Sequence, residues 1–451
     1  PSTRPSDDVG RHGPRAGGRT RDRHGLTREV GNGGTKSIKM TGRANHERLG
    51  IGGLRSNNRN TAALCLRAFS VPYRHAIAHQ IPSLMLRNLP PMHRNHPLIS
   101  RGLLLMMVVT SVGCRQPPLQ DPVEQVLFAT SADMQVACYR IPAIAAVDQQ
   151  LIVAVDERVP SCADLRGSRD INIIARLSSD GGASWGPPQR ILDLPDGQAV
   201  SDPSFVYDAM RGRLFLFVNL MDHDNAPGRY QFLVLHSDDA GHTWSTPTHI
   251  TDTLIPESWR QDFVFITSGR GAQSASGTLL HTLVHLDRGA FVILSQDHGQ
   301  TWTLAPTPVW PADESKIITL PGGTWMVNSR VRDAGYRWVH TSSDEGRTWT
   351  SRPDTQLVDP AVNAALLREG DQLYFANAAH SRARQDLVLR RRHVADPRWT
   401  VVDTLHRGSA AYVTATMLHV HESQHMGLAF ERGDYAEVVF RRLDPNAPLA
   451  E

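Results

Sequence analysis

Arginine supplies nearly all of the positive charge in residues 115–451 of this chain. That part holds 30 Lys and Arg side chains, of which only Lys316 is a lysine. A guanidinium is planar, remains protonated and presents a fork of donors that matches a carboxylate. If the fold gathers several of these arginines at one place, they would bind an anionic substrate.

Two further motifs suggest chemistry that their surroundings do not support. His421–His425 has the His-Glu-x-x-His spelling of a zinc protease, which needs a helix so that both imidazoles share one face. It lies between Val413–Val420 and Met426–Phe430, which have the pattern of adjacent strands, so we expect a hairpin tip and no metal site. Gly269–Gln273 is Gly-rich, but neither the Lys-Ser/Thr pair nor the helix of a phosphate loop follows it.

An eight-residue motif that occurs four times indicates the elements that position such residues. Its pattern is Ser-x-Asp-x-Gly-x-(Ser/Thr)-Trp, and its copies are Ser178–Trp185, Ser237–Trp244, Ser295–Trp302 and Ser342–Trp349. In a β-hairpin turn the Asp accepts hydrogen bonds from turn amides, the Gly supplies a left-handed backbone, and the Trp is expected to hold the turn against the next sheet. Successive copies of the Asp are 59, 58 and 47 residues apart, close to one four-stranded propeller blade.

Short runs of β-branched and aromatic residues between turn-forming residues predict strands from about Val126 onward. Examples are Leu151–Val155, Leu214–Val218, Phe232–Leu235, Phe291–Leu294 and Glu437–Phe440. No helix longer than two turns is expected, and Trp399 marks a fifth hairpin, 50 residues after Trp349. Since a blade takes roughly 50–55 residues, residues 126–448 predict an all-β fold, a six-bladed β-propeller without long exposed edges.

The repeated octet resembles the Asp box, or BNR repeat, of bacterial exo-α-sialidases (neuraminidases), and the resemblance covers essentially residues 126–448. Asp boxes of that family lie on the outer rim, so they indicate the fold and leave the chemistry to other residues. The resemblance implies a glycosidase that removes terminal sialic acids from glycoconjugates with retention, through a Tyr-linked intermediate and without a metal or organic cofactor. Alternatives on the same site are a trans-sialidase, a hydrolase of a related nonulosonate, or a non-catalytic sialic-acid-binding propeller.

Three arginines match the family positions that bind the carboxylate on the anomeric carbon of sialic acid. The matching segments are Tyr139–Pro142, Asn328–Arg330 and Asn377–Leu387. They give Arg140, Arg330 and Arg384 as the triad, with Arg382 competing for the third place.

The resemblance also supplies an acid and two sugar-binding residues. Asp164 follows Asp156-Glu157-Arg158 at the spacing of the family's acid/base Asp, and Asp170 is its rival. A water-poor pocket would help Asp164 by favouring the protonated acid. Arg158 resembles a supporting sugar-binding arginine, and Asp202, in Ser201–Ser204, resembles the Asp that contacts the 4-hydroxyl and N-acyl region.

The nucleophile implied by the resemblance is a tyrosine. A carboxylate nucleophile would approach the like charge of the substrate, and sialidases use a Tyr instead, which is an exception among glycosidases. Gly408–Tyr412 resembles the family's Tyr segment and Glu314–Lys316 the segment with the assisting Glu, so Tyr412 and Glu314 form the expected pair. Gln273 and Trp259 match the glycerol and acyl side of the pocket.

Two cysteines, Cys138 and Cys162, each lie two residues before an expected site residue. An exported protein meets oxidising conditions, so we expect a disulfide that joins the first active-site strand to the acid loop; two buried thiols are the alternative.

The N-terminal residues differ in composition from the rest. Residues 1–91 carry 16 Lys and Arg against 5 Asp and Glu without apolar periodicity, which predicts a leader that does not fold. Residues 92–114, with Met92 as the true start, have the order of a bacterial signal peptide, and residues 115–125 are a linker.

Cys114 ends the signal segment and is the expected acceptor of a lipid, with plain secretion as the alternative. A membrane-spanning helix is disfavoured because the apolar run Leu103–Val109 is far below the roughly 20 residues needed. We therefore expect an exported protein, periplasmic, attached to the outer membrane or secreted.

Charge excludes one class of partner. Residues 115–451 hold 30 Lys and Arg against 40 Asp and Glu, so nucleic acid is not an expected partner. The expected partners are sialylated glycans, and the protein is expected to be a monomer.

Overall fold

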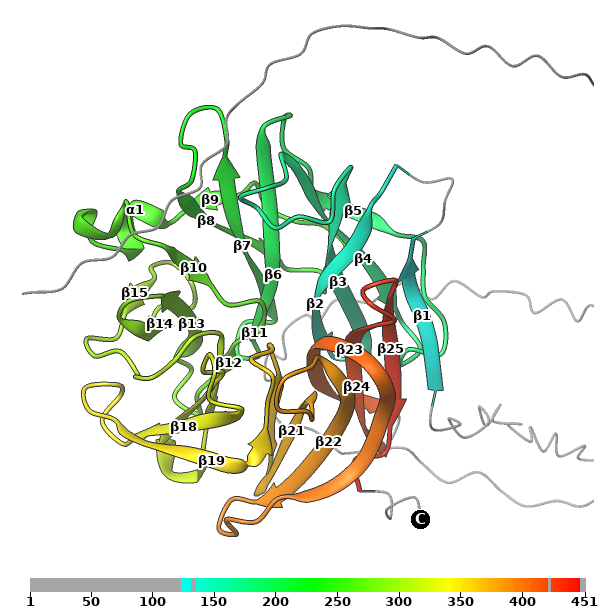
Figure 1. Cartoon of the computed structure of the whole chain (residues 1–451), viewed down its shortest axis with the longest axis vertical. Helices are drawn as coiled ribbons and strands as arrows, with labels where there is room; N and C mark the ends of the chain where they lie inside the picture. Colours follow the sequence, from blue (N-terminus) through cyan, green and yellow to red (C-terminus); the bar gives the residue numbers. More distant parts are fainter. Residues whose placement is uncertain (1–122, 131–134, 421–422, 447–451) are drawn as a thin grey trace, which may run out of the picture. The chain divides into compact units, whose positions relative to one another are not determined.

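The computed structural model describes residues 123–130, 135–420 and 423–446 (Figure 1). The expected leader, signal segment with Cys114 and most of the linker lie outside the described residues. Within the described part the chain is nearly all β, as predicted, and three short helical turns are present: α1 (Thr251–Leu254), η1 (Glu257–Trp259) and η2 (Pro321–Gly323). None of the helices in this part has the length and apolar character that a membrane crossing requires.

Two sheets follow one another in the first half of the described chain. The first is built from β2 (Cys138–Val147), β3 (Gln150–Val159), β4 (Asp170–Ser178) and β5 (Gln189–Leu192) in that order. The second has the order β11-β6-β7-β8-β9, with β6 (Gln198–Asp208), β7 (Arg213–Asp222), β8 (Tyr230–Ser237), β9 (Thr248–His249) and β11 (Gly269–Arg270). Consecutive strands are antiparallel, and β11 joins β6 in parallel.

Two further sheets have the same up-and-down pairing. The third has the order β10-β13-β14-β15, with β12 also on β13; its strands are β10 (Val264–Ile266), β12 (Ala272–Gln273), β13 (Leu279–His285), β14 (Gly289–Ser295) and β15 (Thr303–Leu304). The fourth is formed by β16 (Ser315–Thr319), β17 (Trp325–Ser329), β18 (Tyr336–Ser342) and β19 (Thr350–Val358).

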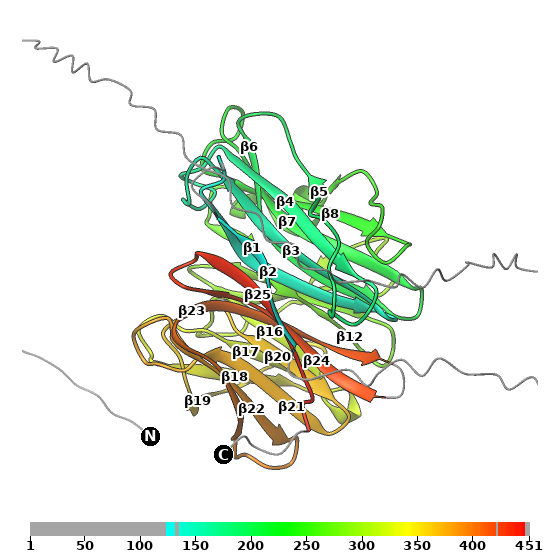
Figure 2. The ribbon, with the colours of Figure 1, turned by 90° about the vertical axis from the view of Figure 1, so that its right-hand side faces the viewer.

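The last sheet contains seven strands and joins both ends of the described chain. Its order is β1-β25-β24-β23-β22-β21-β20, with β1 (Val123–Ala129), β20 (Ala365–Glu369), β21 (Gln372–Ala378), β22 (Gln385–His393), β23 (Thr400–Val420), β24 (Ser423–Arg432) and β25 (Glu437–Leu443). The long β23 pairs with β22 up to Ser409 and with β24 from Ala410 onward. β1 completes the sheet beside β25, where the two ends of the described chain meet (Figure 2).

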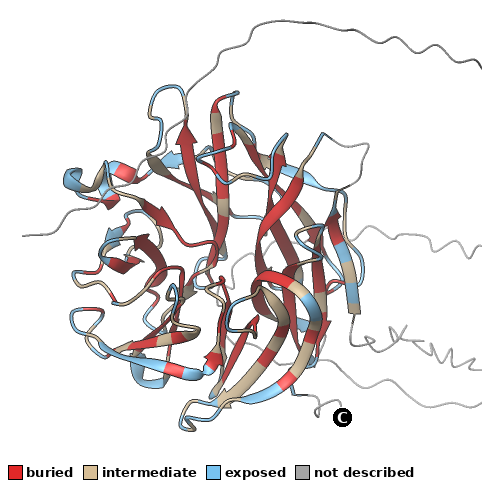
Figure 3. Cartoon of the chain, in the orientation of Figure 1, coloured by how far each residue is buried: buried red, intermediate tan, exposed pale blue. Residues whose placement is uncertain are grey.

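The strands at the inner edges of the sheets contact one another in sequence. β2 contacts β6 and β23, β6 contacts β12 and β13, β13 contacts β16, and β16 contacts β20, which contacts β23. Figure 1 shows the sheets arranged around a centre near β11 and β12. The inner strands are mainly buried, whereas exposed residues gather in turns and outer strands such as β19 (Figure 3). The arrangement is consistent with a β-propeller fold.

Apolar clusters bind each sheet to its neighbour. One joins Ile152 of the first sheet to Leu216 of the second, and the next joins Phe217 to Phe291 of the third. Others join the third sheet to the fourth and the fourth to the fifth, and a last one joins Phe440 on β25 back to Leu151 on β3. All five predicted strand runs lie inside strands, in β3, β7, β8, β14 and β25.

The four octets form turns with the same hydrogen bonds. In the first, Ser178 Oγ donates to Asp180 Oδ1 at 2.8 Å, Ser184 N donates to the same oxygen at 2.8 Å, and Gly182 N donates to Ser178 Oγ at 2.9 Å. Asp239, Asp297 and Asp344 repeat this pattern. Trp399 lies in the turn before β23, as expected for a fifth hairpin.

The turns pack on the preceding sheet, which corrects the expectation that the Trp contacts the next one. Gly182 has φ +85°, and a Cβ there would collide with the ring of Phe440 on the last sheet, which Trp185 also contacts. Trp302 of the third sheet lies edge-on to Phe215 and Phe217 of the second. In both cases the neighbouring sheet on the preceding side of the ring supplies the apolar surface.

Candidate active site

Seven predicted residues line one cavity of about 240 Å³, although they are spread from β2 to β23. They are Arg140, Asp164, Asp202, Glu314, Arg330, Arg384 and Tyr412. The cavity lies near the beginnings of inner strands: Arg140 is the third residue of β2, and Glu314 immediately precedes β16.

Irregular backbone turns three of these side chains toward the cavity. The pairing register shifts between Arg140 and Ala143 on β2, between Ser201 and Ser204 on β6, and between Ala410 and Val413 on β23. Ile141 and Asp202 have φ of 58° and 62°, and a proline follows each. Such bulges re-aim side chains beside functional sites, at the cost of backbone strain.

A tyrosine and a glutamate form the centre of the site. Tyr412 Oη lies 2.8 Å from each carboxylate oxygen of Glu314, to which it donates its proton. Arg330 Nη1 forms an ion pair with the same carboxylate and lies 3.3 Å from Tyr412 Oη. All three side chains are largely buried, so the interactions are little screened.

Burial, and then the nearby Glu314 carboxylate, raise the pKa of Tyr412 well above its ordinary value. The phenol is therefore neutral near neutral pH. It can attack an electrophilic carbon only if its proton moves as the bond forms, and Glu314 is placed to accept that proton.

Glu431 on β24 is a site residue that the sequence did not indicate. It is completely buried, pairs with Arg140 Nε at 2.7 Å, and accepts hydrogen bonds from Ile141 N at 2.8 Å and Tyr412 N at 3.1 Å. One carboxylate thus fixes both an arginine and the backbone of the tyrosine. The signal in the sequence was a Glu at the end of the apolar run Met426–Phe430.

Arg140 and Arg384 each lie over the face of a tyrosine ring. Arg140 Cζ lies 4.0 Å from the ring centroid of Tyr435, and Arg384 Cζ lies 5.4 Å from that of Tyr412. Arg384 Nη1 also donates to Tyr435 Oη at 3.3 Å. Arg382 is exposed and does not line the cavity, so the structure brings Arg384 to the third position.

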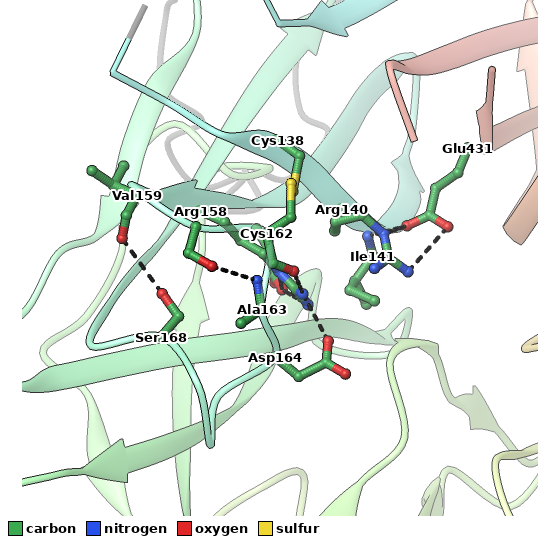
Figure 4. Close-up of a disulfide and its surroundings, with 12 residues drawn as sticks. Cys138, Arg140, Ile141, Arg158, Val159, Cys162, Ala163, Asp164, Ser168 and Glu431 are labelled. Carbon is green, nitrogen blue, oxygen red and sulfur yellow. Dashed lines mark hydrogen bonds and ion pairs between the residues drawn. A yellow bond between two sulfur atoms is a disulfide. The ribbon is translucent and has the colours of Figure 1, made fainter. Parts of the chain in front are cut away.

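The acid loop is attached to β2 and β3 (Figure 4). A disulfide joins Cys138 to Cys162, as expected, and Arg158 Nη1 donates to Cys162 O at 2.9 Å. The same nitrogen pairs with Asp164 Oδ1 at 2.7 Å, while Arg158 Nη2 pairs with buried Asp156 at 2.9 Å. Arg158 thus lies behind Asp164.

The environment of Asp164 differs from the expectation of a water-poor pocket. Its side chain is 78% exposed, because the loop carries it to the rim of the cavity. The rival Asp170 lies on β4, binds Asn172 Nδ2 at 3.1 Å and is not part of the cavity lining.

Asp202 lies in a hydrogen-bond network on the floor of the cavity. Its Oδ2 accepts from Asn219 Nδ2 at 2.9 Å, and its N–H donates to Asp156 Oδ1 at 3.1 Å. Burial, followed by the nearby Asp156 carboxylate, raises the pKa of Asp202 to about 8. At neutral pH the protonated Asp202 can donate a hydrogen bond to a ligand.

Three predicted residues do not line this cavity: Arg158, which is buried behind Asp164, Gln273 and Trp259. Gln273 on β12 is held by Asp208 Oδ1 at 2.7 Å and by Ala209 N at 2.9 Å. Trp259 packs against His285 and Phe291. Instead, Tyr230, Phe263 and Phe265 form an aromatic wall, which suits the C–H face or acyl group of a sugar.

The His-Glu-x-x-His sequence has no helical geometry where it is described. His425 lies on strand β24, and His421 lies outside the described residues. No three His, Cys, Asp or Glu side chains in the described part of the chain are grouped to hold a metal ion.

The fold and the cavity define a propeller-type protein with an arginine-lined anion pocket facing a Tyr–Glu pair. Comparison with known proteins agrees: residues 161–430 match the family of BNR repeat-like domains. That match covers more than half of the chain, which belongs to this family.

The similar proteins are sialidases. The sialidase of Micromonospora viridifaciens is 31% identical over 317 residues, covering 62% of this chain and 48% of that protein. The sialidase of Bacteroides fragilis is 28% identical over 255 residues, covering 51% and 46%. This chain therefore spans about half the length of these curated relatives.

Solved structures agree in fold. A Hadza microbial sialidase has a TM-score of 0.62 at 25% identity, covering 70% of this chain and 67% of that one. The leech intramolecular trans-sialidase, complexed with 2,7-anhydro-Neu5Ac, has a TM-score of 0.60 at 16% identity, covering 72% and 71%, and supports the fold alone.

Proposed function

We propose that this protein is an exo-α-sialidase that hydrolyses terminal sialic acids from glycoproteins, glycolipids or oligosaccharides. The observation that carries the proposal is the gathering of Arg140, Arg330 and Arg384 around Tyr412. Three guanidinium groups at one cavity match an anionic sugar, and a neutral phenol can approach the carbon beside its carboxylate.

In the first step Asp164, protonated, donates its proton to the departing glycosidic oxygen. Tyr412 Oη bonds to the anomeric carbon while its proton passes to Glu314, which Arg330 holds in place. The aglycone leaves with the proton from Asp164, and the sugar is attached to Tyr412. The exposed position of Asp164 suits an acid that must reach the leaving group at the rim.

In the second step Asp164 acts as base toward a water molecule. The water oxygen attacks the anomeric carbon, Tyr412 leaves as the phenol with the proton returned from Glu314, and sialic acid is released with retained configuration. Arg158 stays paired to Asp164 and fixes its position in both steps.

We also propose that the fold is a closed propeller of six blades. If β23 is divided at Ser409 and Ala410, the strand pairing gives six antiparallel sets around the inner strands, which supports a six-bladed propeller. The cluster between Phe440 and Leu151 supports closure between the last and first sets.

We further propose that the protein is exported, with lipid attached at Cys114, and acts as a monomer. The disulfide Cys138–Cys162 supports export because such bridges persist in oxidising compartments.

The experiment is cleavage of a fluorogenic α-sialoside, with mass spectrometry of the sugar released from sialyllactose. Free sialic acid supports the proposed hydrolysis. Lack of cleavage would contradict enzymatic activity. A 2,7-anhydro sugar or a transferred sialic acid as the main product would mean that the enzyme catalyses transfer and not hydrolysis.

A further inference from the structure

A second cavity, of about 340 Å³, lies farther along the same inner strands. Its lining includes Ile144 on β2, Tyr207 on β6, Thr319 on β16 and Thr416 on β23. These positions follow the corresponding residues of the candidate active site by four or five places. At about 3.3 Å per strand residue, the two cavities are roughly 13–17 Å apart. We call this second site the far cavity.

A buried polar layer separates the two cavities. Ser204, Lys316 and Thr414 each come two residues after Asp202, Glu314 and Tyr412 on their strands, and all three are buried. Lys316 Nζ donates to Ser268 O at 2.7 Å and to Asn363 Oδ1 at 2.6 Å, which fixes it across the centre. The far cavity is therefore a separate site and no extension of the first.

Arg270, from the Gly-rich segment that the candidate active site does not use, contributes a guanidinium to the far cavity. Its Nη1 donates to Ala415 O at 3.0 Å and its Nε to Gly271 O at 3.3 Å. Among the described residues, Nη2 has no acceptor and no carboxylate pairs with Arg270. Burial lowers the pKa of Arg270 to about 10, and no carboxylate among the described residues compensates its charge.

Two hydroxyl groups of the far cavity also lack partners. Tyr207 Oη and Thr319 Oγ1 form no hydrogen bond to the residues that the structure describes, and both residues line the cavity. Burial raises the pKa of Tyr207, so its hydroxyl keeps its proton and can donate. Ile144, Phe205 and Leu367 supply apolar surface beside them.

The charged side chains that line the far cavity indicate the charge of a ligand that would bind there. Arg270 and Arg368 are opposed by Glu369, which leaves one positive charge in excess. A single negative charge balances this excess, whereas a dianion would leave one negative charge uncompensated.

We propose that the far cavity binds a monocarboxylate of about monosaccharide size. Arg270 pairs with the carboxylate, and the hydroxyls of Tyr207 and Thr319 hydrogen-bond to its polar groups. A volume of about 340 Å³ is within the usual range for small-molecule sites. The proposal does not depend on sialidase activity.

The test is calorimetric titration with D-glucuronate, with D-glucose as the uncharged control, on wild type, Arg270→Met and Arg330→Met. If D-glucuronate binds in the far cavity, its binding is expected to persist in Arg330→Met. It should weaken roughly tenfold or more in Arg270→Met, because an ionic hydrogen bond is lost. Sialoside hydrolysis, measured in parallel, is expected to be unchanged in Arg270→Met. Binding that is lost only in Arg330→Met, or glucuronate binding no tighter than that of glucose, would overturn the proposal.

Two conservative variants keep the test decisive if Arg270→Met does not fold. Tyr207→Phe and Thr319→Val each remove one hydroxyl with little change in volume, and each is expected to weaken glucuronate binding several-fold without lowering the unfolding temperature. Unchanged affinity in both would contradict the site. Inorganic phosphate is the dianion probe: weaker binding than glucuronate supports the monocarboxylate, and equal or tighter binding overturns it.

Discussion

Tyr412 Oη lies 2.8 Å from both carboxylate oxygens of Glu314, although the two residues are 98 positions apart in the chain. Tyr412 belongs to β23 in the last sheet and Glu314 precedes β16 in the fourth. Their contact therefore depends on the packing of separate sheets around one centre. The same packing brings Arg330 to both.

Replacing Tyr412 by Phe removes the oxygen that we propose as the nucleophile and leaves the ring in its apolar contacts. We expect kcat for a fluorogenic sialoside to fall by roughly 10³-fold or more, with little change in the unfolding temperature. Tyr435→Phe is the matched control, because Tyr435 lies against Arg140 but does not contact Glu314. A Tyr412→Phe variant within about tenfold of wild type would remove Tyr412 from the chemistry.

Glu431→Gln is expected to raise KM for the sialoside and to lower the free energy of unfolding. The change removes the charge that pairs with Arg140 in a buried setting, which costs about 3–5 kcal/mol. Glu437→Gln is the control: it breaks a partly exposed pair with Arg432 and should cost less than about 1 kcal/mol. Urea unfolding and steady-state kinetics of both variants measure the difference, and equal losses would argue against the special role of Glu431.

The double variant Cys138→Ser, Cys162→Ser tests the bridge to the acid loop. A bridge across a sequence separation of 24 residues stabilises the fold by about 3 kcal/mol. We expect the variant to lose this stability and to turn over more slowly, because the loop with Asp164 is less firmly held. Wild type treated with a reductant should show the same urea unfolding curve as the double variant. If the curve of oxidised wild type coincides with these two curves, the bridge is contradicted.

Asp202 should make the stability depend on pH. Its pKa is about 8 in the folded protein and about 4 when unfolded, so between these values the folded protein retains a proton that the unfolded chain releases. The contribution to stability is therefore full below about pH 4 and declines up to about pH 8. Asp202→Asn should abolish this decline and be more stable than wild type at pH 8 by at least about 1 kcal/mol. Parallel stability–pH curves for the two proteins would be inconsistent with this shift.

Lipid attachment at Cys114 predicts that a labelled fatty acid is incorporated into wild type expressed in a bacterial host and not into Cys114→Ser. Absence of label in wild type would leave plain secretion as the route of export. The measurement is autoradiography of the purified proteins.

The local features of the fold could be predicted because their causes lie within a few residues. Each octet contains all the groups of its own turn, so the bond from Ser184 N to Asp180 follows from the sequence alone. The direction in which the Trp packs could not be predicted, since Trp185 meets Phe440, 255 residues away.

The site residues divide in the same way. Arg140, Glu314 and Tyr412 were predicted through family motifs, whereas Glu431 was missed because its contacts to Arg140 and Ile141 span almost 300 positions. Gln273 lies outside the candidate active site, since a Gly-rich segment does not reveal which end of the inner strands it faces. The exposure of Asp164 depends on the path of its loop, which spacing does not determine.

The most direct test of the central claim is covalent trapping with a 2,3-difluorosialic acid, followed by peptide mass spectrometry. We expect one added sugar on the peptide that contains Tyr412, and no adduct in Tyr412→Phe. An adduct on another residue, or an active enzyme that forms no adduct, would contradict the assignment of Tyr412 as the nucleophile in the arginine-lined cavity.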